Sequence, residues 1–134
     1  MSTELIVVES GVPPKGYANG RIGRGPVLHV AGQVGWNAQG VFEAKDLAGQ
    51  FAQALSNVIA VVHAANGRTT DIAEMTMYVT DIAAYRAARK QLGPIWKERM
   101  LTHFPAMALV AVSALVEPEA LVEIQAVAYL EHQE

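Results

Sequence analysis

ALVEIQAVAYL, the stretch Ala120–Leu130, decides the fold of this chain. Its apolar, β-branched and aromatic residues are typical of a buried strand. A second run, Ala106–Val116 (AMALVAVSALV), has apolar residues at both alternating sets of positions. We interpret the two runs as a pair of neighbouring strands joined by a turn at Val116–Glu119 (VEPE). Strands with two apolar faces must be covered on both sides.

Glu123 places a carboxylate in this apolar stretch. An ionised carboxylate in an apolar site must find donors and a cation, or it takes up a proton. A carboxylate held in that way can serve as a general base near neutral pH. Alternatively, Glu123 faces solvent on an edge strand or forms a salt bridge at an interface. The pattern of residues supports both interpretations equally.

Length and composition limit the class of protein. The 134 residues are expected to form one domain, residues 1–134. Hydrophobic residues make up 51% and charged residues 17%, so part of the apolar surface is expected to contact another subunit. The net charge of −3 argues against a nucleic-acid or anionic-membrane partner. The absence of cysteine excludes disulfides, thiolate metal sites and a cysteine nucleophile.

The amino-terminal stretch MSTELIVVES has neither a basic start nor a long apolar core. No run in the sequence approaches the roughly 20 apolar residues that a membrane-spanning helix needs. A cytoplasmic protein without a membrane partner is therefore the expectation.

Hydrophobic periodicity predicts the remaining elements. The predicted strands are Leu5–Val8, Arg21–Gly23, Val27–Val34 and Glu74–Thr80, with a hairpin turn between the second and third at Arg24–Gly25–Pro26. Helical spacing predicts a helix over Asp46–Asn66 that ends at Gly67, and a second helix from the N-cap Asp81 through Met100, kinked or restarted at Pro94.

This pattern carries an argument about assembly. Two helices can cover only one face of a sheet of five or six strands, and the other face then needs a partner subunit. We therefore predict a homo-oligomer with clefts between its protomers.

Seven short motifs occur in the order and spacing of one family. The chain resembles the RidA/YjgF family over nearly its whole length. The motifs are Gly16–Tyr17, Val30–Gly35, Gln50 with Leu55–Val58, Asp71–Ile72, Tyr78–Asp81, Phe104–Ala106 and Val122–Ile124.

The resemblance implies a fold and a function. The fold would be a chorismate-mutase-like α+β domain, with a six-stranded mixed sheet and two helices packed on one face, assembled as a homotrimer with three intersubunit clefts. The activity would be hydrolysis of enamines or imines, such as 2-aminoacrylate, to keto acids and ammonia. No metal and no cofactor would be needed, and the partners would be the chain itself and a small-molecule ligand.

The resemblance also assigns roles at the predicted site. A glutamate that positions water in the family matches Glu123, which would be the catalytic residue. The arginine that binds the substrate carboxylate in the family is replaced by Met107, which offers no charge. A thioether instead suits an apolar or aromatic group, so the substrate would differ from 2-aminoacrylate. Alternatively, Met107 is a packing residue in a cleft that no longer catalyses.

Four further residues are candidates for substrate binding. Arg89 matches a cleft-lining asparagine and would restore a cation, unless it is simply solvated beside Arg86 and Lys90. Tyr17 would stack on a ligand or only anchor its loop. Gly32 would allow close approach to the backbone or mark a bulge. Leu109 would add an apolar wall to the cleft or belong to the core.

Two classes of function remain open at this point. One is a hydrolytic deaminase that uses Glu123; the other is a binding or regulatory trimer without catalysis. The four histidines, at positions 29, 63, 103 and 132, form no metal-ligand motif.

Overall fold

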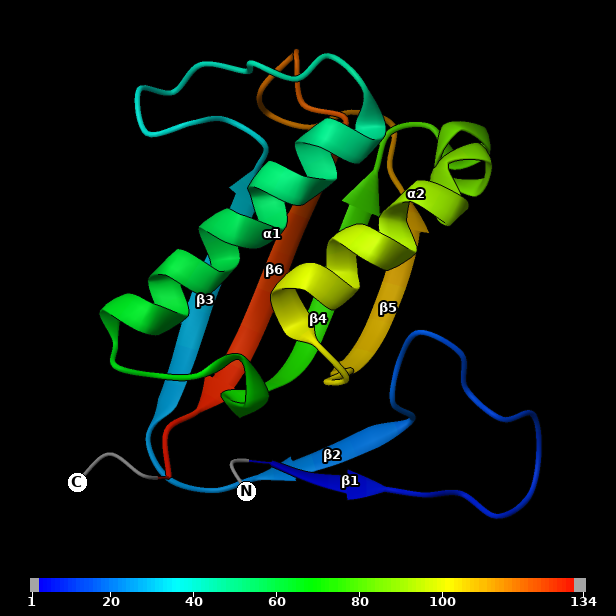
Figure 1. The fold of residues 1–134 in the computed structure, drawn as a ribbon, viewed down its shortest axis with the longest axis vertical. Coiled ribbons are helices and arrows are strands. Elements are labelled where there is room, and N and C mark those ends of the chain that lie inside the picture. Colours follow the sequence, from blue (N-terminus) through cyan, green and yellow to red (C-terminus); the bar gives the residue numbers. More distant parts are fainter. Residues whose placement is uncertain (1–2, 132–134) are drawn as a thin grey trace.

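The protein is a two-layer α+β domain, described here for residues 3–131 of a computed structural model. Both helices lie on the same face of the larger sheet (Figure 1). This arrangement confirms the predicted α+β fold with two helices on one face. In chain order the elements are β1 (Thr3–Ile6), β2 (Gly20–Gly23), β3 (Val27–Val34), α1 (Leu47–Ala64), a short 3₁₀ helix (Thr69–Asp71), β4 (Ile72–Val79), α2 (Ile82–Met100), β5 (Ala106–Ala111) and β6 (Val122–Tyr129).

The strands form two sheets, whereas the family resemblance implied one six-stranded sheet. Four strands form a mixed sheet in the order β3-β6-β4-β5, in which only β4 and β5 are parallel. β1 and β2 pair with each other in a separate antiparallel ribbon. The predicted hairpin between the second and third strands is therefore wrong, because β3 pairs with β6 instead.

The predicted pairing of the last two runs is also wrong. β4 lies between β5 and β6 and bonds to both. β5 follows β4 through the crossover helix α2, which is the usual way to join two parallel strands. The long connection after β5 then carries the chain across β4 before β6 begins. β5 and β6 are thus consecutive in the sequence but are not neighbours in the sheet.

Both helices begin where the sequence predicts. The side chain of Asp46 accepts a hydrogen bond from the backbone N–H of Gly49 at 3.2 Å, and that of Asp81 accepts one from Ala84 at 3.0 Å. Such caps satisfy N–H groups that have no partner within the helix. At the end of α1 the positive φ falls on Asn66 (61°) rather than on the predicted Gly67. α2 runs through Pro94 without ending there.

The core lies between α1, α2 and the four-stranded sheet. Of the helices that the structure describes, α1 alone is long and apolar enough to cross a membrane by length and composition. Its apolar side is buried against the sheet, so core packing accounts for this composition. The buried residues on this side are Leu47, Ala48, Phe51, Ala54, Leu55, Val58 and Val62.

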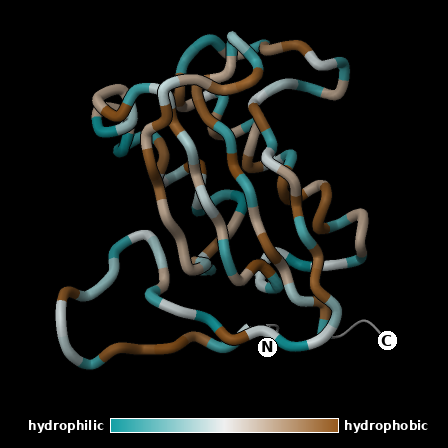
Figure 2. The backbone as a smooth tube through the Cα atoms, turned by 180° about the vertical axis from the view of Figure 1, so that it is seen from behind, coloured by the Kyte–Doolittle hydropathy of each residue, from teal (hydrophilic) through white to brown (hydrophobic). Residues whose placement is uncertain are grey.

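The opposite face of the sheet carries no helix (Figure 2). Along β6 the residues Val122, Ile124, Ala126 and Ala128 are buried beneath the helices, and the alternate set points to the uncovered face. Glu123 belongs to this alternate set and is partly buried in the single chain. Whether another protomer covers this face stays a prediction.

Gln50 connects α1 to the entrance of β6. It is 1% exposed, and its Nε2 donates to the backbone oxygens of Ala44 (3.2 Å) and Glu119 (3.0 Å). Its Oε1 accepts from the N–H of Leu121 at 2.7 Å. One side chain therefore satisfies three backbone groups, and the last of these lies two residues before Glu123.

We expect Gln50→Leu to lower the free energy of unfolding by about 2 kcal/mol or more, because buried backbone groups would lose their partners. Urea denaturation measures this change. The matched control is Gln53→Leu, since Gln53 lies on the same helix and bonds only to the side chain of Asn57 among the contacts described. Equal losses for the two variants would contradict the role given to Gln50.

Candidate functional site

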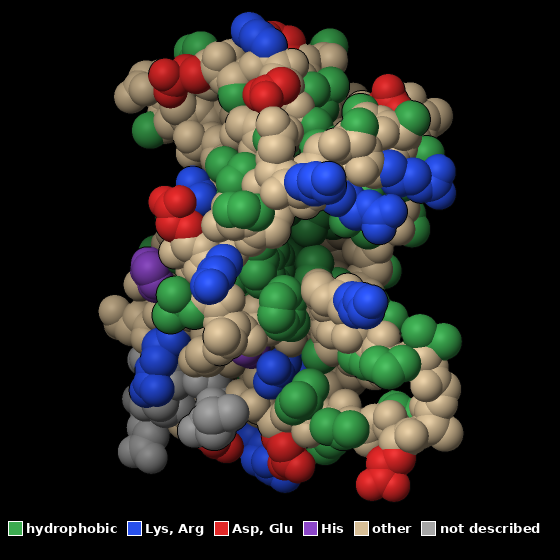
Figure 3. Space-filling view, turned by 45° about the vertical axis from the view of Figure 1, so that its right-hand side comes forward, with side chains coloured by type: hydrophobic (Ala, Val, Ile, Leu, Met, Phe, Trp, Pro, Cys, Tyr) green, Lys and Arg blue, Asp and Glu red, His purple; other side chains and the backbone are tan. Residues whose placement is uncertain are grey.

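A pocket of about 720 Å³ opens between α2, β5 and the loop that precedes β2. Figure 3 shows the hollow, with hydrophobic side chains on its floor and basic side chains around it. Its lining residues are Lys15, Gly16, Tyr17, Phe51, Met77, Tyr85, Arg89, Leu92, Gly93, Trp96, Lys97, Leu101, Thr102, Phe104, Met107, Ala108 and Leu109.

The register of β5 places two predicted site residues in this pocket. Met107 pairs with Met75 and Leu109 pairs with Met77, and both partners are buried on the helix side of β4. Residues paired across strands point to the same side of a sheet. Met107 and Leu109 therefore face α2 rather than the uncovered face.

A backbone contact brings Tyr17 to the same pocket. The N–H of Ala18 donates to the carbonyl of Pro105 at 2.9 Å, and Ala18 forms an isolated parallel bridge with Ala106. Arg21 supports this contact, because its Nε donates to the carbonyl of Phe104 at 2.8 Å. The loop is thus held against the start of β5, and Tyr17, 39% exposed, lies at the pocket mouth.

Three cations line the pocket: Lys15, Arg89 and Lys97. No carboxylate is among the lining residues that the structure describes. None of the three cations has a hydrogen-bond or ion-pair partner among residues 3–131. Arg99 on the same helix differs, since its Nε donates to Ser56 Oγ at 2.9 Å. The pocket is therefore positively charged and its cations are free for a ligand.

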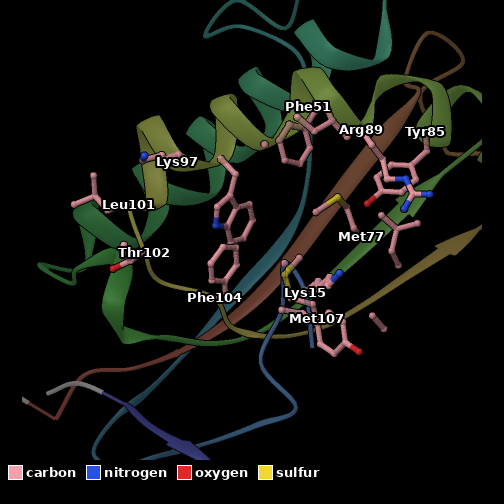
Figure 4. Close-up of a pocket in the computed structure, with 17 residues that line it drawn as sticks. Lys15, Phe51, Met77, Tyr85, Arg89, Lys97, Leu101, Thr102, Phe104 and Met107 are labelled. Atoms are coloured by element: carbon pink, nitrogen blue, oxygen red, sulfur yellow. The ribbon is translucent and has the colours of Figure 1, made fainter. Parts of the chain in front are cut away.

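Aromatic rings form part of the pocket wall. Trp96 and Phe104 stack with ring centroids 5.7 Å apart and an interplanar angle of 5°. The indole N–H of Trp96 donates to the carbonyl of His103 at 3.1 Å, which fixes the ring. Figure 4 shows Phe51, Met77, Phe104 and Met107 around the interior of the pocket, with Arg89 beside Tyr85.

Glu123 and Gly32 lie together, but away from this pocket. A Cβ atom at Gly32 would stand 2.7 Å from Glu123 Cδ and Oε2, so only glycine leaves room for the carboxylate against β3. A bulge between Val30 and Gln33 also interrupts the pairing here. Glu123 points to the uncovered face, whereas Met107 points to the helix side.

The structure therefore separates the predicted site residues into two groups. Tyr17, Arg89, Met107 and Leu109 line one pocket, and Gly32 and Glu123 lie on the other face of the sheet. One chain alone does not place the carboxylate and the cation around one ligand.

Sequence reasoning missed several lining residues of this pocket. Trp96 and Lys97 lie about two helical turns beyond Arg89 on α2, and Lys15 precedes the Gly16–Tyr17 motif. Helical spacing from Arg89 was a signal for Trp96 and Lys97. No sequence pattern points to Lys15, because only the loop contact with β5 brings it near.

No group of three or more histidine, cysteine, aspartate or glutamate residues within 3–131 is placed to hold a metal ion. His132 lies outside the described residues. The expectation of a metal-free site stays a prediction.

His103 supports the pocket from behind. It is 8% exposed, and its Nε2 lies 2.7 Å from the carbonyl oxygen of Ile72. A carbonyl only accepts, so Nε2 carries the proton and donates. Burial lowers the pKa of His103, and the nearby Arg21 lowers it further, whereas the bond to Ile72 and the charge of Asp71 oppose the shift.

The family model described as Endoribonuclease L-PSP matches residues 11–130. A RutC family protein of Pyrococcus horikoshii is 30% identical over 129 residues, which is 96% of this chain and 98% of the relative. The crystal structure of YyfB, a conserved Rid family protein of Yersinia pestis, has a TM-score of 0.82 at 32% identity and covers 97% of this chain and 100% of its own.

A second solved structure agrees. The YjgF gene product of E. coli has a TM-score of 0.70 at 30% identity, with 90% of this chain and 91% of that chain covered. Fold and pocket define a two-layer α+β protein with a small-molecule-sized site at a sheet edge. This chain belongs to the endoribonuclease L-PSP family, which is the RidA/YjgF family, and the predicted family membership is confirmed.

The shifted pKa of His103 predicts how stability depends on pH. As the pH falls below 6.5, histidine in the unfolded chain takes up a proton more readily than the buried His103 does. The free energy of unfolding should therefore decrease from pH 7 to pH 5. This decrease should be smaller in His103→Gln, measured by urea denaturation at each pH.

His63→Gln is the matched control, because His63 is exposed on α1. It should keep the pH dependence of the wild type. If His103→Gln also shows the full wild-type decrease in the free energy of unfolding from pH 7 to pH 5, protonation of His103 does not contribute to that decrease.

Proposed function

We propose that the protein is a hydrolytic deaminase of an enamine- or imine-type metabolite other than 2-aminoacrylate. The observation that carries this proposal is the carboxylate of Glu123, held against Gly32 on an uncovered sheet face, in a chain whose pocket holds three unpaired cations. Family membership supports the class of reaction.

The chemistry needs few groups. Glu123 accepts a proton from a water molecule, and the water oxygen attacks the imine carbon. Proton transfer to the nitrogen of the resulting carbinolamine lets the C–N bond break, which releases ammonia and leaves a carbonyl compound. An enamine enters the same sequence after protonation of its carbon converts it to the imine. No electrons are transferred, so the proposed reaction requires no redox group.

The site would be completed by a second copy of the chain. Glu123 and the pocket occupy opposite faces of one sheet, so a ligand in the pocket of one protomer can meet Glu123 only from another protomer. The edge strand β5 borders the pocket, and among the described residues its outer side is paired only through the isolated bridge between Ala18 and Ala106. We infer a homotrimer, in which each cleft receives residues from two protomers.

Arg89 would replace the cation that is missing at position 107. Its guanidinium lines the pocket together with Met107, and it has no partner among residues 3–131. A guanidinium can bind a carboxylate through two parallel hydrogen bonds. With the cation on the helix instead of the strand, the thioether of Met107 remains in the pocket as a surface against which an apolar group can pack.

A second candidate function is a binding or regulatory trimer without catalysis. The observation that favours it is Met107, since the residue that binds the substrate carboxylate in the resembling family members is absent. Such a protein would be stabilised by its ligand and would release no product. We expect a cytoplasmic location and no nucleic-acid partner for either function.

Light scattering on the purified protein tests the assembly. We expect a mass of three times the 14.4 kDa chain at micromolar concentration. Val127→Asp places a charge on the uncovered face of β6 and should dissociate the trimer, whereas Ala60→Asp on the exposed side of α1 should not. A wild type that is monomeric removes the basis of the composite site.

Glu123→Gln should lower ammonia release from a panel of imines by about 100-fold or more, because an amide cannot accept the proton of water. The panel includes 2-aminoacrylate, which should be a poor substrate of the wild type. Glu74→Gln is the matched control, since Glu74 lies exposed on the same sheet face.

The oligomeric mass of Glu123→Gln should equal that of the wild type. Wild-type protein that binds a ligand but releases no ammonia from any imine would favour the non-catalytic function. Full activity in Glu123→Gln would rule out its role as the base.

A further inference from the structure

The pocket is much larger than a three-carbon metabolite requires. Sites for drug-sized ligands commonly measure about 300–1,000 Å³, and this pocket of about 720 Å³ lies within that range. A ligand that filled only the area around Met107 would leave the remaining apolar wall in contact with water.

The apolar wall of the pocket is suited to a ring. The stacked pair of Trp96 and Phe104 presents aromatic surface, and the largely buried Phe51 and Leu92 add to the apolar lining. Aromatic rings pack well against such surfaces in stacked or edge-on arrangements. The thioethers of Met77 and Met107 adapt to the edge of a ring and make favourable contacts with it.

The positive charge of the pocket favours a ligand that carries an anionic group in addition to its ring. Arg89 and Lys97 are eight residues apart on α2, which corresponds to roughly 12 Å along the helix axis. Figure 4 shows Arg89 and Tyr85 at one end of the pocket and Lys97 at the other. With no carboxylate among the described lining residues, the field of the pocket attracts anions.

We propose that the pocket binds an anion with an aromatic or similarly bulky cyclic body, whose carboxylate is bound by Arg89 and whose ring lies against Trp96 and Phe104. This inference rests on the proposed function for the reaction, and it adds the substrate class: imines or enamines that carry a ring and a carboxylate. Lys15 and Lys97 contribute general positive charge, whereas the guanidinium of Arg89 makes the bidentate contact.

Binding of three stable probes tests this inference without any turnover. The probes are 3-phenylpropanoate, propanoate and 3-phenylpropan-1-ol, which carry the ring and the charge, the charge alone and the ring alone. Isothermal titration calorimetry on the oligomer as purified measures each affinity. We expect 3-phenylpropanoate to bind at least tenfold more tightly than either of the other two.

Fluorescence then locates the bound ring. The chain has two tryptophans, so in Trp36→Phe all tryptophan emission, excited at wavelengths that tyrosine does not absorb, comes from Trp96. Saturating 3-phenylpropanoate should change that emission, and propanoate should not. Trp36 lies in a separate cluster with Phe42, away from the pocket residues, so the background substitution leaves the pocket intact.

Charge variants locate the carboxylate. Arg89→Gln should weaken binding of 3-phenylpropanoate by about tenfold and leave binding of 3-phenylpropan-1-ol unchanged. Arg86→Gln is the matched control, because it removes the same group from the same helix outside the pocket lining. Thermal melting of both variants verifies that they remain folded.

Three results would overturn the inference: equal affinity for 3-phenylpropanoate and propanoate, unchanged Trp96 emission at saturation, or equal effects of the two arginine variants. Failure of the proposed function is a different result. Tight binding of 3-phenylpropanoate with no ammonia release from ring-bearing imines would retain the ligand class and reject the deaminase. Ammonia release from small imines without binding of the aromatic anion would retain the deaminase and reject the ligand class.

Discussion

The packing of α1 and α2 on one face of the four-stranded sheet is the constraint on which the rest of the structure depends. Residues of β4 and β6 alternate between that covered face and the uncovered face. Burial of Ile124 and Met77 beneath the helices therefore decides that Glu123 points the other way. A shift of one residue in register would exchange the two sets and bury the carboxylate in the core.

The same constraint explains why the functional groups are divided. Helix α2 crosses over from β4 to β5 and brings Arg89 and Trp96 above Met107, which creates a pocket at the sheet edge. The carboxylate of Glu123 remains on the far face. A domain built in two layers thus keeps these groups on opposite faces of the sheet, and association of protomers is the way in which we propose that they meet.

Much of the secondary structure follows from local rules. The predicted strand Val27–Val34 matches β3, and Asp81 caps a helix that ends at Met100 as predicted. Strand pairing could not be read in the same way. The hairpin to β3 and the pairing of the last two runs were wrong, because pairing depends on which buried faces meet after the helices pack. Several strands of similar hydrophobicity do not reveal from the sequence which of them pair with each other.

The sequence by itself determined both helix starts, because caps and periodicity act over a few residues. It also supplied Glu123, Arg89 and Met107, and its resemblance to a known family implied the α+β class. Only the tertiary structure decided that Arg89 and Met107 share a pocket and that Glu123 lies outside it. It also decided that Lys15 and Phe104 join them, through the contact of Ala18 with Pro105. These proximities join segments far apart in the chain, and only the completed packing of helices, loop and sheet brings them together.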